Sequence, residues 1–421
     1  MAQDSVTSSN KLHLCFQGLN AAVELDQSDA LLSTIREAMP NWHFEAAPFS
    51  AERPICARIN RISETRFRVE VFDGTAEPTE WDSVNTVCQL IGQLAWEQLR
   101  SSPHVLCLHA AAVEYRGKLI LIPNSRRAGK STLCALLAHQ GLRIFSDDFV
   151  MLHANEQGHL CGYSNGVLPR IRLPLPKSFP SDVRDWIAQQ SGPKNRQYQY
   201  IASNALPPRN EPCPVGAVVF LDRQSDAEQP VLQSVPDGAA IDQLLHQNFA
   251  RSIHSGVSLT ALHDLVASVP TLSLTYREAP DAAQHLLEAL DRLDLPTARL
   301  DNYTTNRPPE AEFQTANHQT TPLDEMETYT QARGVTRVST ETEDYLSDSS
   351  GLGVYRLNAG SAAIWQILSI PASAQDVITI LQAAFPDVPP SQIQDDALQT
   401  LTQFARARLI ETALATEGEL A

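Results

Sequence analysis

A short polar loop between an apolar strand and a helix constrains this chain most. Leu119–Ile122 is strongly apolar, and Thr132–Ala138 has the composition of a helix. Between them the sequence reads Asn124-Ser125-Arg126-Arg127-Ala128-Gly129-Lys130-Ser131-Thr132. Its second half fits the phosphate-loop pattern G-x-x-x-x-G-K-[ST], whereas Asn124 replaces the first glycine. The sequence therefore predicts an α/β domain in which this loop joins a strand to a helix.

The residue types in the loop suit nucleotide phosphates. Consecutive backbone N–H groups wrap the phosphate oxygens, and the N-terminus of the following helix adds a favourable dipole. Lys130 is expected to contact the β- and γ-phosphates, and the Ser131 hydroxyl to ligate Mg²⁺. Gly129 leaves room for the phosphates to approach the backbone. We therefore expect ATP and Mg²⁺ as cofactors, with residues 124–132 as the binding segment.

The replaced glycine leaves alternatives open. Asparagine tolerates a left-handed backbone better than most residues, and we expect Asn124 to keep the turn in this way. One alternative is a chance match within a structural turn. Another is a loop that binds nucleotide without turning it over.

Two adjacent acids follow the next predicted strand. Asp147 and Asp148 come directly after Leu142–Phe145 and Ser146. Ligands gather at the carboxyl ends of strands in open α/β sheets. We expect one acid, Asp147, to help Ser131 hold Mg²⁺ and the other to accept a proton from an attacking hydroxyl. The alternative is an exposed acidic pair that caps a turn.

Composition narrows the class of protein. Hydrophobic residues make up 43% of the 421 residues, which argues against global disorder. A net charge of -17 argues against nucleic acid as a partner. The seven cysteines contain no C-x-x-C pair, so reduced buried thiols are favoured over zinc or catalysis. The chain has neither a signal-peptide pattern nor an apolar run of about 20 residues, so we expect a cytoplasmic protein without a membrane partner.

Changes of pattern divide the chain into four segments. Residues 1–104 form an N-terminal α+β segment with a strongly amphipathic helix at Asp82–Leu99. Residues 105–296 contain the phosphate loop, and 297–332 are polar with little periodicity, as in a linker. Residues 333–421 read as strands followed by three helices, a winged-helix-like arrangement. The task of the first segment stays open, either completing the sheet or contacting a second copy in a homo-oligomer.

The order of the central motifs resembles the catalytic domain of the HPr kinase/phosphorylase family. His109-Ala110-Ala111-Ala112-Val113, the loop, and Ser146-Asp147-Asp148 follow one another as in that family. The family phosphorylates a serine hydroxyl on a protein. The resemblance covers roughly residues 105–290 and implies that His109, Lys130 and the acidic pair act in catalysis. HPr itself is not implied as the substrate, because only the catalytic core of this chain resembles that family.

Five further cations are candidates to contact phosphate or substrate, although such side chains more often lie on the surface without a ligand. They are Arg170, Arg172, Lys177, Arg251 and His254. The family has one further glutamate and one further arginine in its site, and the sequence alone does not assign them to positions here.

The C-terminal segment resembles the PqqD family, the recognition domain used in ribosomal peptide maturation. The residues that carry this resemblance are Tyr355-Arg356-Leu357-Asn358, Ala362-Ala363-Ile364-Trp365, Ile378 through Phe385, and Leu409-Ile410-Glu411. In that family a leader peptide adds as an extra strand to the edge of a sheet. The resemblance implies that residues 333–413 bind the leader of a ribosomal precursor peptide. DNA is a less suitable partner, because acids at 395 and 396 offset the arginines of the last helix.

Together these patterns predict an ATP-dependent kinase that phosphorylates a Ser or Thr hydroxyl of a ribosomally synthesised peptide. The linker would keep the substrate close to the phosphate site. A second hypothesis is a nucleotide-gated peptide-binding chaperone with little phosphoryl transfer, which the change at Asn124 motivates. A third, a small-molecule hydroxyl kinase, would leave the C-terminal segment without a role.

Overall fold

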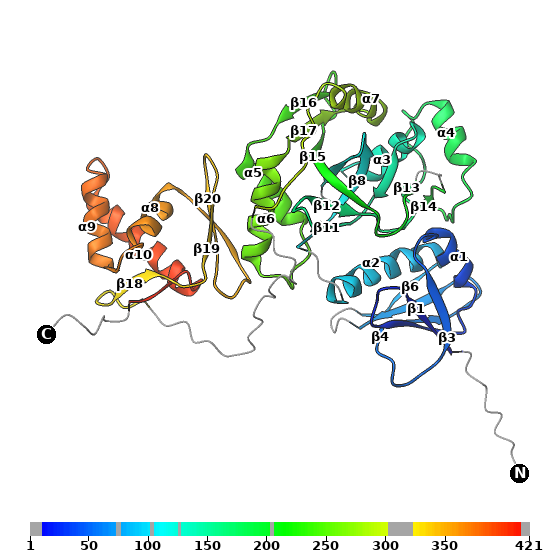
Figure 1. Cartoon of the computed structure of the whole chain (residues 1–421), viewed down its shortest axis with the longest axis horizontal. Coiled ribbons are helices and arrows are strands. Elements are labelled where there is room, and N and C mark those ends of the chain that lie inside the picture. Colours follow the sequence, from blue (N-terminus) through cyan, green and yellow to red (C-terminus); the bar gives the residue numbers. More distant parts are fainter. Residues whose placement is uncertain are drawn as a thin grey trace, which may run out of the picture. The chain divides into compact units, whose positions relative to one another are not determined.

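The computed structural model describes residues 11–72, 77–101, 105–124, 128–202, 206–301 and 323–413 (Figure 1). Contacts divide the chain into two compact units. The first contains the described residues of Met1–Pro236, His246–Ala250 and Asp264–Asn306. The second contains those of Asp237–Leu245, Arg251–His263 and Arg307–Ala421. The four segment boundaries expected from the sequence stay a prediction.

The first unit begins with a sheet that, in the described residues, has six strands in the order β3-β1-β2-β4-β5-β6. The alternation of residues over Cys56–Ile62 and Arg66–Phe72 predicts two paired strands. The structure confirms them as β4 and β5, which run antiparallel. Apolar and polar residues alternate along β4, and Ala57 and Ile59 are fully buried. The strands are β1 Lys11–Phe16, β2 Ala22–Asp26, β3 Phe44–Pro48, β4 Ile55–Arg61, β5 Phe67–Val71 and β6 Thr79–Trp81.

Two helices accompany this sheet, α1 (Leu31–Ala38) and α2 (Ser83–Ser101). They contact each other, and α2 also lies against β4, β5 and β6. The apolar spacing over Asp29–Met39 predicts a helix capped by Asp29. The helix is confirmed, but the cap is wrong, because Ala30 occupies the N-cap and makes no side-chain cap hydrogen bond. By contrast, the Asp82 carboxylate accepts the Asn85 N–H at 2.9 Å and so caps α2.

The central sheet has nine strands within the described residues and confirms a mixed α/β fold. Its long strand β15 pairs in parallel with β9 on one side and β17 on the other. Parallel pairs need covering helices, which explains the apolar run of β9. The strands are β7 Leu106–Leu108, β8 Ala110–Tyr115, β9 Lys118–Pro123, β10 Arg143–Ser146, β11 Val150–Ala154, β12 Leu160–Tyr163, β15 Pro212–Arg223, β16 Val231–Ser234 and β17 Thr271–Tyr276.

Helices α3 (Lys130–His139) and α7 (Ala279–Leu290) pack together and share one apolar core with the central sheet. The core includes Ile122 of β9 and Leu133 of α3, so the strand and the helix on either side of the loop are both anchored by burial. The sequence did not predict α4 (Ser181–Ala188), α5 (Asp237–Gln247) or α6 (Ser255–Ser268).

A two-stranded ribbon, also not predicted, lies beside α3. It pairs β13 (Arg170–Arg172) antiparallel with β14 (Tyr198–Tyr200). Arg170 stands opposite Tyr200 and Arg172 opposite Tyr198. Side chains at alternate positions of a strand share a face, so these four side chains project from one side of the ribbon.

The second unit contains two small sheets and three helices of the C-terminal segment, counted over its described residues. One sheet has the order β19-β20-β21 and the other β22-β18-β23. Strand β18 lies within the stretch expected to be a linker, and it pairs with β22 and β23. The elements are β18 Thr328–Gln331, β19 Thr336–Ser339, β20 Asp344–Ser347, β21 Val354–Leu357, α8 Ala359–Ile367, β22 Ala372–Ser373, α9 Ala374–Ala384, α10 Pro390–Arg406 and β23 Ile410–Thr412.

The sequence of this segment predicts a helix capped by Asn358 and a second helix over Ala374–Ala384, and both predictions are confirmed. Asn358 is the N-cap of α8, and its side chain accepts the Ser361 N–H at 2.8 Å. The helix predicted at Ala374–Ala384 has these bounds in the structure.

No helix in the described ranges has the length and apolar character that crossing a membrane requires.

All seven cysteines are free, as the sequence predicted, and five of them are buried. Burial raises the pKa of the Cys107 and Cys134 thiols well above the ordinary value, which keeps them protonated and unreactive.

Candidate functional site

Gly129 joins the loop to α3 with a left-handed backbone, φ 100°. A Cβ at this position would lie 2.4 Å from Tyr276 Oη, so both the backbone and the available space require glycine. The Tyr276 hydroxyl in turn donates to the Ala128 carbonyl at 3.1 Å. The first N–H groups of α3 therefore face the loop and form a natural anion site. Ser125, Arg126 and Arg127 lie outside the described residues, whereas Thr132 lies in the first turn of α3.

Asn124 has a different role from the one predicted. Its side-chain Nδ2 donates to the Leu221 carbonyl at 2.9 Å, and the Leu221 N–H donates to its Oδ1 at 2.7 Å. The expectation of a left-handed backbone at Asn124 is wrong. Positive φ values at described residues other than glycine occur at Gln27, Arg116, Asn210 and Arg408. Asn124 instead ties the end of β9 to β15 through its side chain.

Lys130 and Ser131 begin α3 and meet the loop and the acidic pair. Lys130 is buried, and its ammonium group donates to the Asn124 carbonyl at 2.5 Å, folded back over the loop. A hydrogen bond from Ser131 reaches the Asp147 carboxylate and favours its ionised form. The two residues predicted to hold the metal are therefore in direct contact.

Asp147 is buried, with 6% of its surface exposed. One of its oxygens accepts the backbone N–H of Arg170 at 3.0 Å. Burial raises the pKa of Asp147 to about 6, and the positive charge of Arg170 opposes this rise. The carboxylate is thus mostly ionised at neutral pH, at a cost in free energy that burial imposes.

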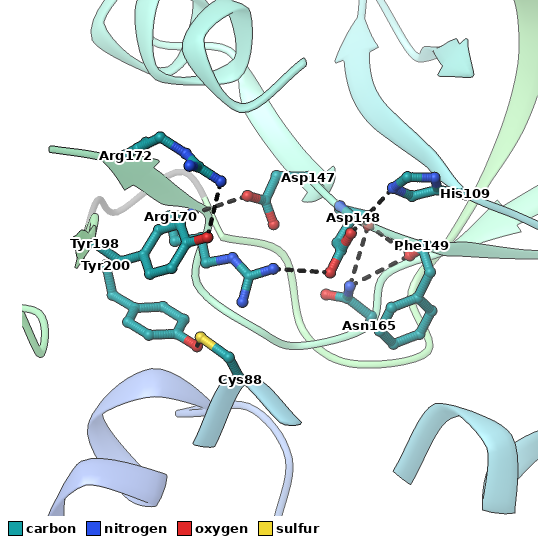
Figure 2. A network of polar contacts seen from close by, with 11 residues as sticks. Cys88, His109, Asp147, Asp148, Phe149, Asn165, Arg170, Arg172, Tyr198 and Tyr200 are labelled. Carbon is teal, nitrogen blue, oxygen red and sulfur yellow. Dashed lines mark hydrogen bonds and ion pairs between the residues drawn. The ribbon is translucent and has the colours of Figure 1, made fainter. Parts of the chain in front are cut away.

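Asp148 lies beside it, but 44% of its side-chain surface is exposed. Its Oδ1 is 3.3 Å from Nε2 of His109, and its Oδ2 accepts from the Arg170 guanidinium at 3.1 Å (Figure 2). Burial pushes its pKa up, but the hydrogen bond with His109 and the charges of Arg170, His109 and Lys130 outweigh burial and lower it to about 2. Asp148 is therefore a fixed, accessible negative charge.

Of the five candidate cations, Arg170 is the one that contacts the acidic pair within the described structure. Arg172 donates to the Tyr198 hydroxyl at 3.0 Å and lies over its ring. Lys177 and Arg251 are exposed. His254 belongs to the second unit, where its Nε2 lies 3.3 Å from the Ser349 carbonyl.

The sequence missed the groups that hold Asp148 in place. The Ser146 hydroxyl donates to the Phe149 carbonyl at 2.5 Å and accepts the Asp148 N–H at 3.1 Å. The Asn165 amide donates to both the Ser146 hydroxyl and the Phe149 carbonyl (Figure 2). A serine just before an acidic turn often makes such local bonds, so Ser146 could have been inferred, whereas Asn165 could not.

The residues fit a nucleotide with Mg²⁺. The hydroxyl of Ser131 and the carboxylate of Asp147 are hard oxygen donors of the kind that Mg²⁺ prefers. Among the described residues no three His, Cys, Asp or Glu side chains are grouped to hold a metal ion. Mg²⁺ itself commonly uses one or two carboxylates and completes its shell with water and phosphate.

Comparison with known proteins bears on two parts of the chain. Residues 343–410 match the family model described as Coenzyme PQQ synthesis protein D (PqqD), which confirms the C-terminal resemblance. The solved structure of the Hpr(Ser) kinase/phosphatase from Coxiella burnetii is similar at 16% identity and a TM-score of 0.23, covering 44% of this chain and 93% of that one. No curated protein matches the chain.

Proposed function

We propose that this protein is an ATP-dependent kinase that phosphorylates a Ser or Thr hydroxyl of a ribosomally synthesised peptide. The observation that supports this most is the meeting of Lys130 and Ser131 with the Asp147–Asp148 pair at the ends of β9 and β10. A phosphate-binding loop beside two carboxylates of different basicity suits phosphoryl transfer, which depends mainly on positioning and charge stabilisation.

In this proposal residues 124–132 bind the nucleotide phosphates, with Lys130 as the charged contact. Ser131 and Asp147 hold the metal. Bound Mg²⁺–ATP supplies the phosphoryl group and neutralises its developing charge. Because the pKa of Asp147 is about 6, its carboxylate is available to a cation at neutral pH.

Asp148 is the group that we propose to face the substrate hydroxyl. It is half-exposed, and His109 and Arg170 each hold one of its oxygens. A carboxylate with a low pKa is a weak base, so its contribution is to orient the hydroxyl and to take the proton late. His109 and Arg170 fix the direction in which the Asp148 carboxylate accepts a hydrogen bond.

The C-terminal segment is proposed to capture the leader of the precursor peptide. Support comes from the PqqD match at residues 343–410 and from the three-stranded sheet β19-β20-β21, whose outer strands leave edges for a peptide strand. We propose that this segment is a winged-helix-like module, with the preceding polar stretch as a tether that raises the local concentration of the substrate. The proposed setting is the cytoplasm.

Intact-protein mass spectrometry tests the proposal directly. The protein is incubated with ATP, Mg²⁺ and the short peptides encoded beside its gene. A peptide should gain one phosphate, and Lys130→Ala and Asp148→Asn should each abolish the gain. Lys194→Ala, which changes an exposed lysine outside the loop, is the matched control.

Leader binding should survive in Lys130→Ala, because residues 343–410 lie outside the loop and the acidic pair. Unchanged turnover in Lys130→Ala would overturn the proposed site. Binding of both ATP and peptide without any gain in mass would overturn the kinase and favour a nucleotide-gated peptide chaperone.

A further inference from the structure

The N-terminal part of the chain, whose task the sequence left open, contacts the β13–β14 ribbon at two places. The Cys88 thiol lies 3.2 Å from the Tyr200 hydroxyl. The Asp82 carboxylate accepts two hydrogen bonds from Nδ2 of Asn195, at 2.9 and 3.0 Å. Cys88 lies in α2 and Asp82 caps it, so a single helix holds the ribbon twice.

The two residues that α2 contacts, Tyr200 and Asn195, are structural parts of the ribbon. Tyr200 is 1% exposed and stands opposite Arg170 in the strand register. Asn195 closes the turn before β14, because its side chain accepts the Tyr198 N–H at 2.7 Å and its own N–H donates to the Tyr198 carbonyl at 2.9 Å. Contacts that hold Asn195 and Tyr200 therefore also hold β14 in place. Because β13 pairs with β14, they hold β13 as well.

Arg170 on β13 connects this support to the site. Its backbone N–H bonds Asp147 and its guanidinium bonds Asp148. A long arginine side chain loses conformational entropy when it is held in one conformation, so its position depends on the groups around it. Figure 2 shows the Tyr200 hydroxyl beside the Cys88 sulfur and the Arg170 guanidinium bonded to Asp148, and the strand register places Tyr200 opposite Arg170.

We infer that α2 is a positioning element of the catalytic site. Cys88 and Asp82 hold Tyr200 and Asn195, and these keep the ribbon where Arg170 meets Asp148. The N-terminal segment is then part of the machinery for phosphoryl transfer and not a separate module. The kinetic consequence of this inference rests on the proposed function.

A double-mutant cycle tests whether Tyr200 acts through Arg170. Tyr200→Phe should lower kcat roughly tenfold with the KM for ATP unchanged, because a small misplacement of a catalytic group costs rate more than binding. In an Arg170→Lys background the same change should have no further effect. Independent effects that multiply would overturn the inference. Tyr115→Phe is the matched control, because it likewise removes a tyrosine hydroxyl, one that bonds Asp291 at the C-terminal end of α7.

Cysteine variants give a second test of the same contact. Cys88→Ala should lower kcat as Tyr200→Phe does, whereas Cys88→Ser should retain most of kcat, because a hydroxyl can still bond Tyr200. Equal losses in Cys88→Ala and Cys88→Ser would contradict positioning through this contact.

Amide hydrogen exchange gives a measurement that needs no turnover. Exchange at residues 170–172 should become faster in Tyr200→Phe and in Asn195→Ala and stay unchanged in Tyr115→Phe. Unchanged exchange in the first two variants would overturn the inference whatever the activity. Faster exchange in a protein whose wild type shows no phosphoryl transfer would support the positioning role and refute the proposed function.

Discussion

The side-chain amide of Asn124 hydrogen-bonds both backbone groups of Leu221, which lies 97 positions later in the chain. Asn124 occupies the place of the first glycine in the phosphate-loop pattern, and its backbone is not left-handed. The change from glycine is therefore compensated by a bond between β9 and β15. The replacement of glycine by Asn124 is therefore not in itself a reason to expect a loop that binds nucleotide without turning it over.

Restoring the glycine should damage the protein. Asn124→Gly leaves the Leu221 N–H and carbonyl without their partners and adds backbone freedom to the unfolded chain. We expect the free energy of unfolding to fall by about 1–3 kcal/mol, without a gain in kcat. Urea unfolding and the rate of ADP formation measure the two effects.

Asn124→Asp is the matched control for this change. It keeps the oxygen that accepts from the Leu221 N–H but places an acceptor against the Leu221 carbonyl. Its stability should therefore be lowered as well, through loss of the donor and repulsion between the new oxygen and the Leu221 carbonyl. A glycine variant as stable as the wild type would show that the bond with Leu221 contributes little.

Gly129→Ala should abolish nucleotide binding. Its left-handed backbone costs a non-glycine residue on the order of 1 kcal/mol, and the new methyl group would collide with the Tyr276 hydroxyl. Combining it with Tyr276→Phe removes the collision but leaves the backbone strain, so ATP affinity should recover only in part. Isothermal titration of ATP–Mg²⁺ into both variants measures this, and full recovery in the double variant would assign the whole effect to Tyr276.

Sequence patterns could predict those parts of the site that local interactions build. The amphipathic repeat predicted the α2 helix, and the apolar flanks of the loop predicted β9 and α3. The position of Asp147 after a strand predicted its place near the loop, because strand ends gather at one edge of a sheet. These inferences depend on residues a few positions apart.

The remaining parts depend on contacts between distant residues. Strand β13 has only three residues, Arg170-Ile171-Arg172, too few to show alternation, and its partner strand comes much later. Nothing in the sequence distinguished Arg170 from the four other candidate cations. Cys88 looked like one more apolar residue on a helix, since its partner Tyr200 lies 112 positions away. Strand β18 was missed because Thr328–Gln331 is polar and pairs only with distant strands.

Asp147→Asn should stabilise the protein at neutral and alkaline pH while removing activity. The folded pKa of Asp147, about 6, is above the ordinary value of 3.8, so the folded state binds the proton more tightly than the unfolded state. The contribution of Asp147 to stability is therefore greatest at low pH and is lost between about pH 4 and 6. At pH 8 we expect the variant to be more stable by about 1–3 kcal/mol, a difference that disappears near pH 4.

Urea unfolding at both pH values, with EDTA and without nucleotide, measures the effect of Asp147→Asn. The adjacent acid serves as the control, because the pKa of Asp148 is lowered to about 2 and its charge stabilises the folded state above pH 3.8. Asp148→Asn should therefore be less stable than the wild type at pH 8. An Asp147→Asn variant that is also less stable at pH 8 would contradict the account of a buried, strained charge.

Two arginines on the same face of one strand give the sharpest comparison in the site. Arg170 holds an oxygen of Asp148 at 3.1 Å, whereas Arg172 bonds the Tyr198 hydroxyl. Arg170→Gln should lower kcat roughly a hundredfold, because Asp148 loses one of the two groups that fix its direction. Arg172→Gln should change kcat by less than about threefold, since an exposed contact to Tyr198 contributes little. Rates of phosphopeptide formation at saturating ATP measure both variants, and equal losses would show that the site depends on the charge of the ribbon and not on the bond with Asp148.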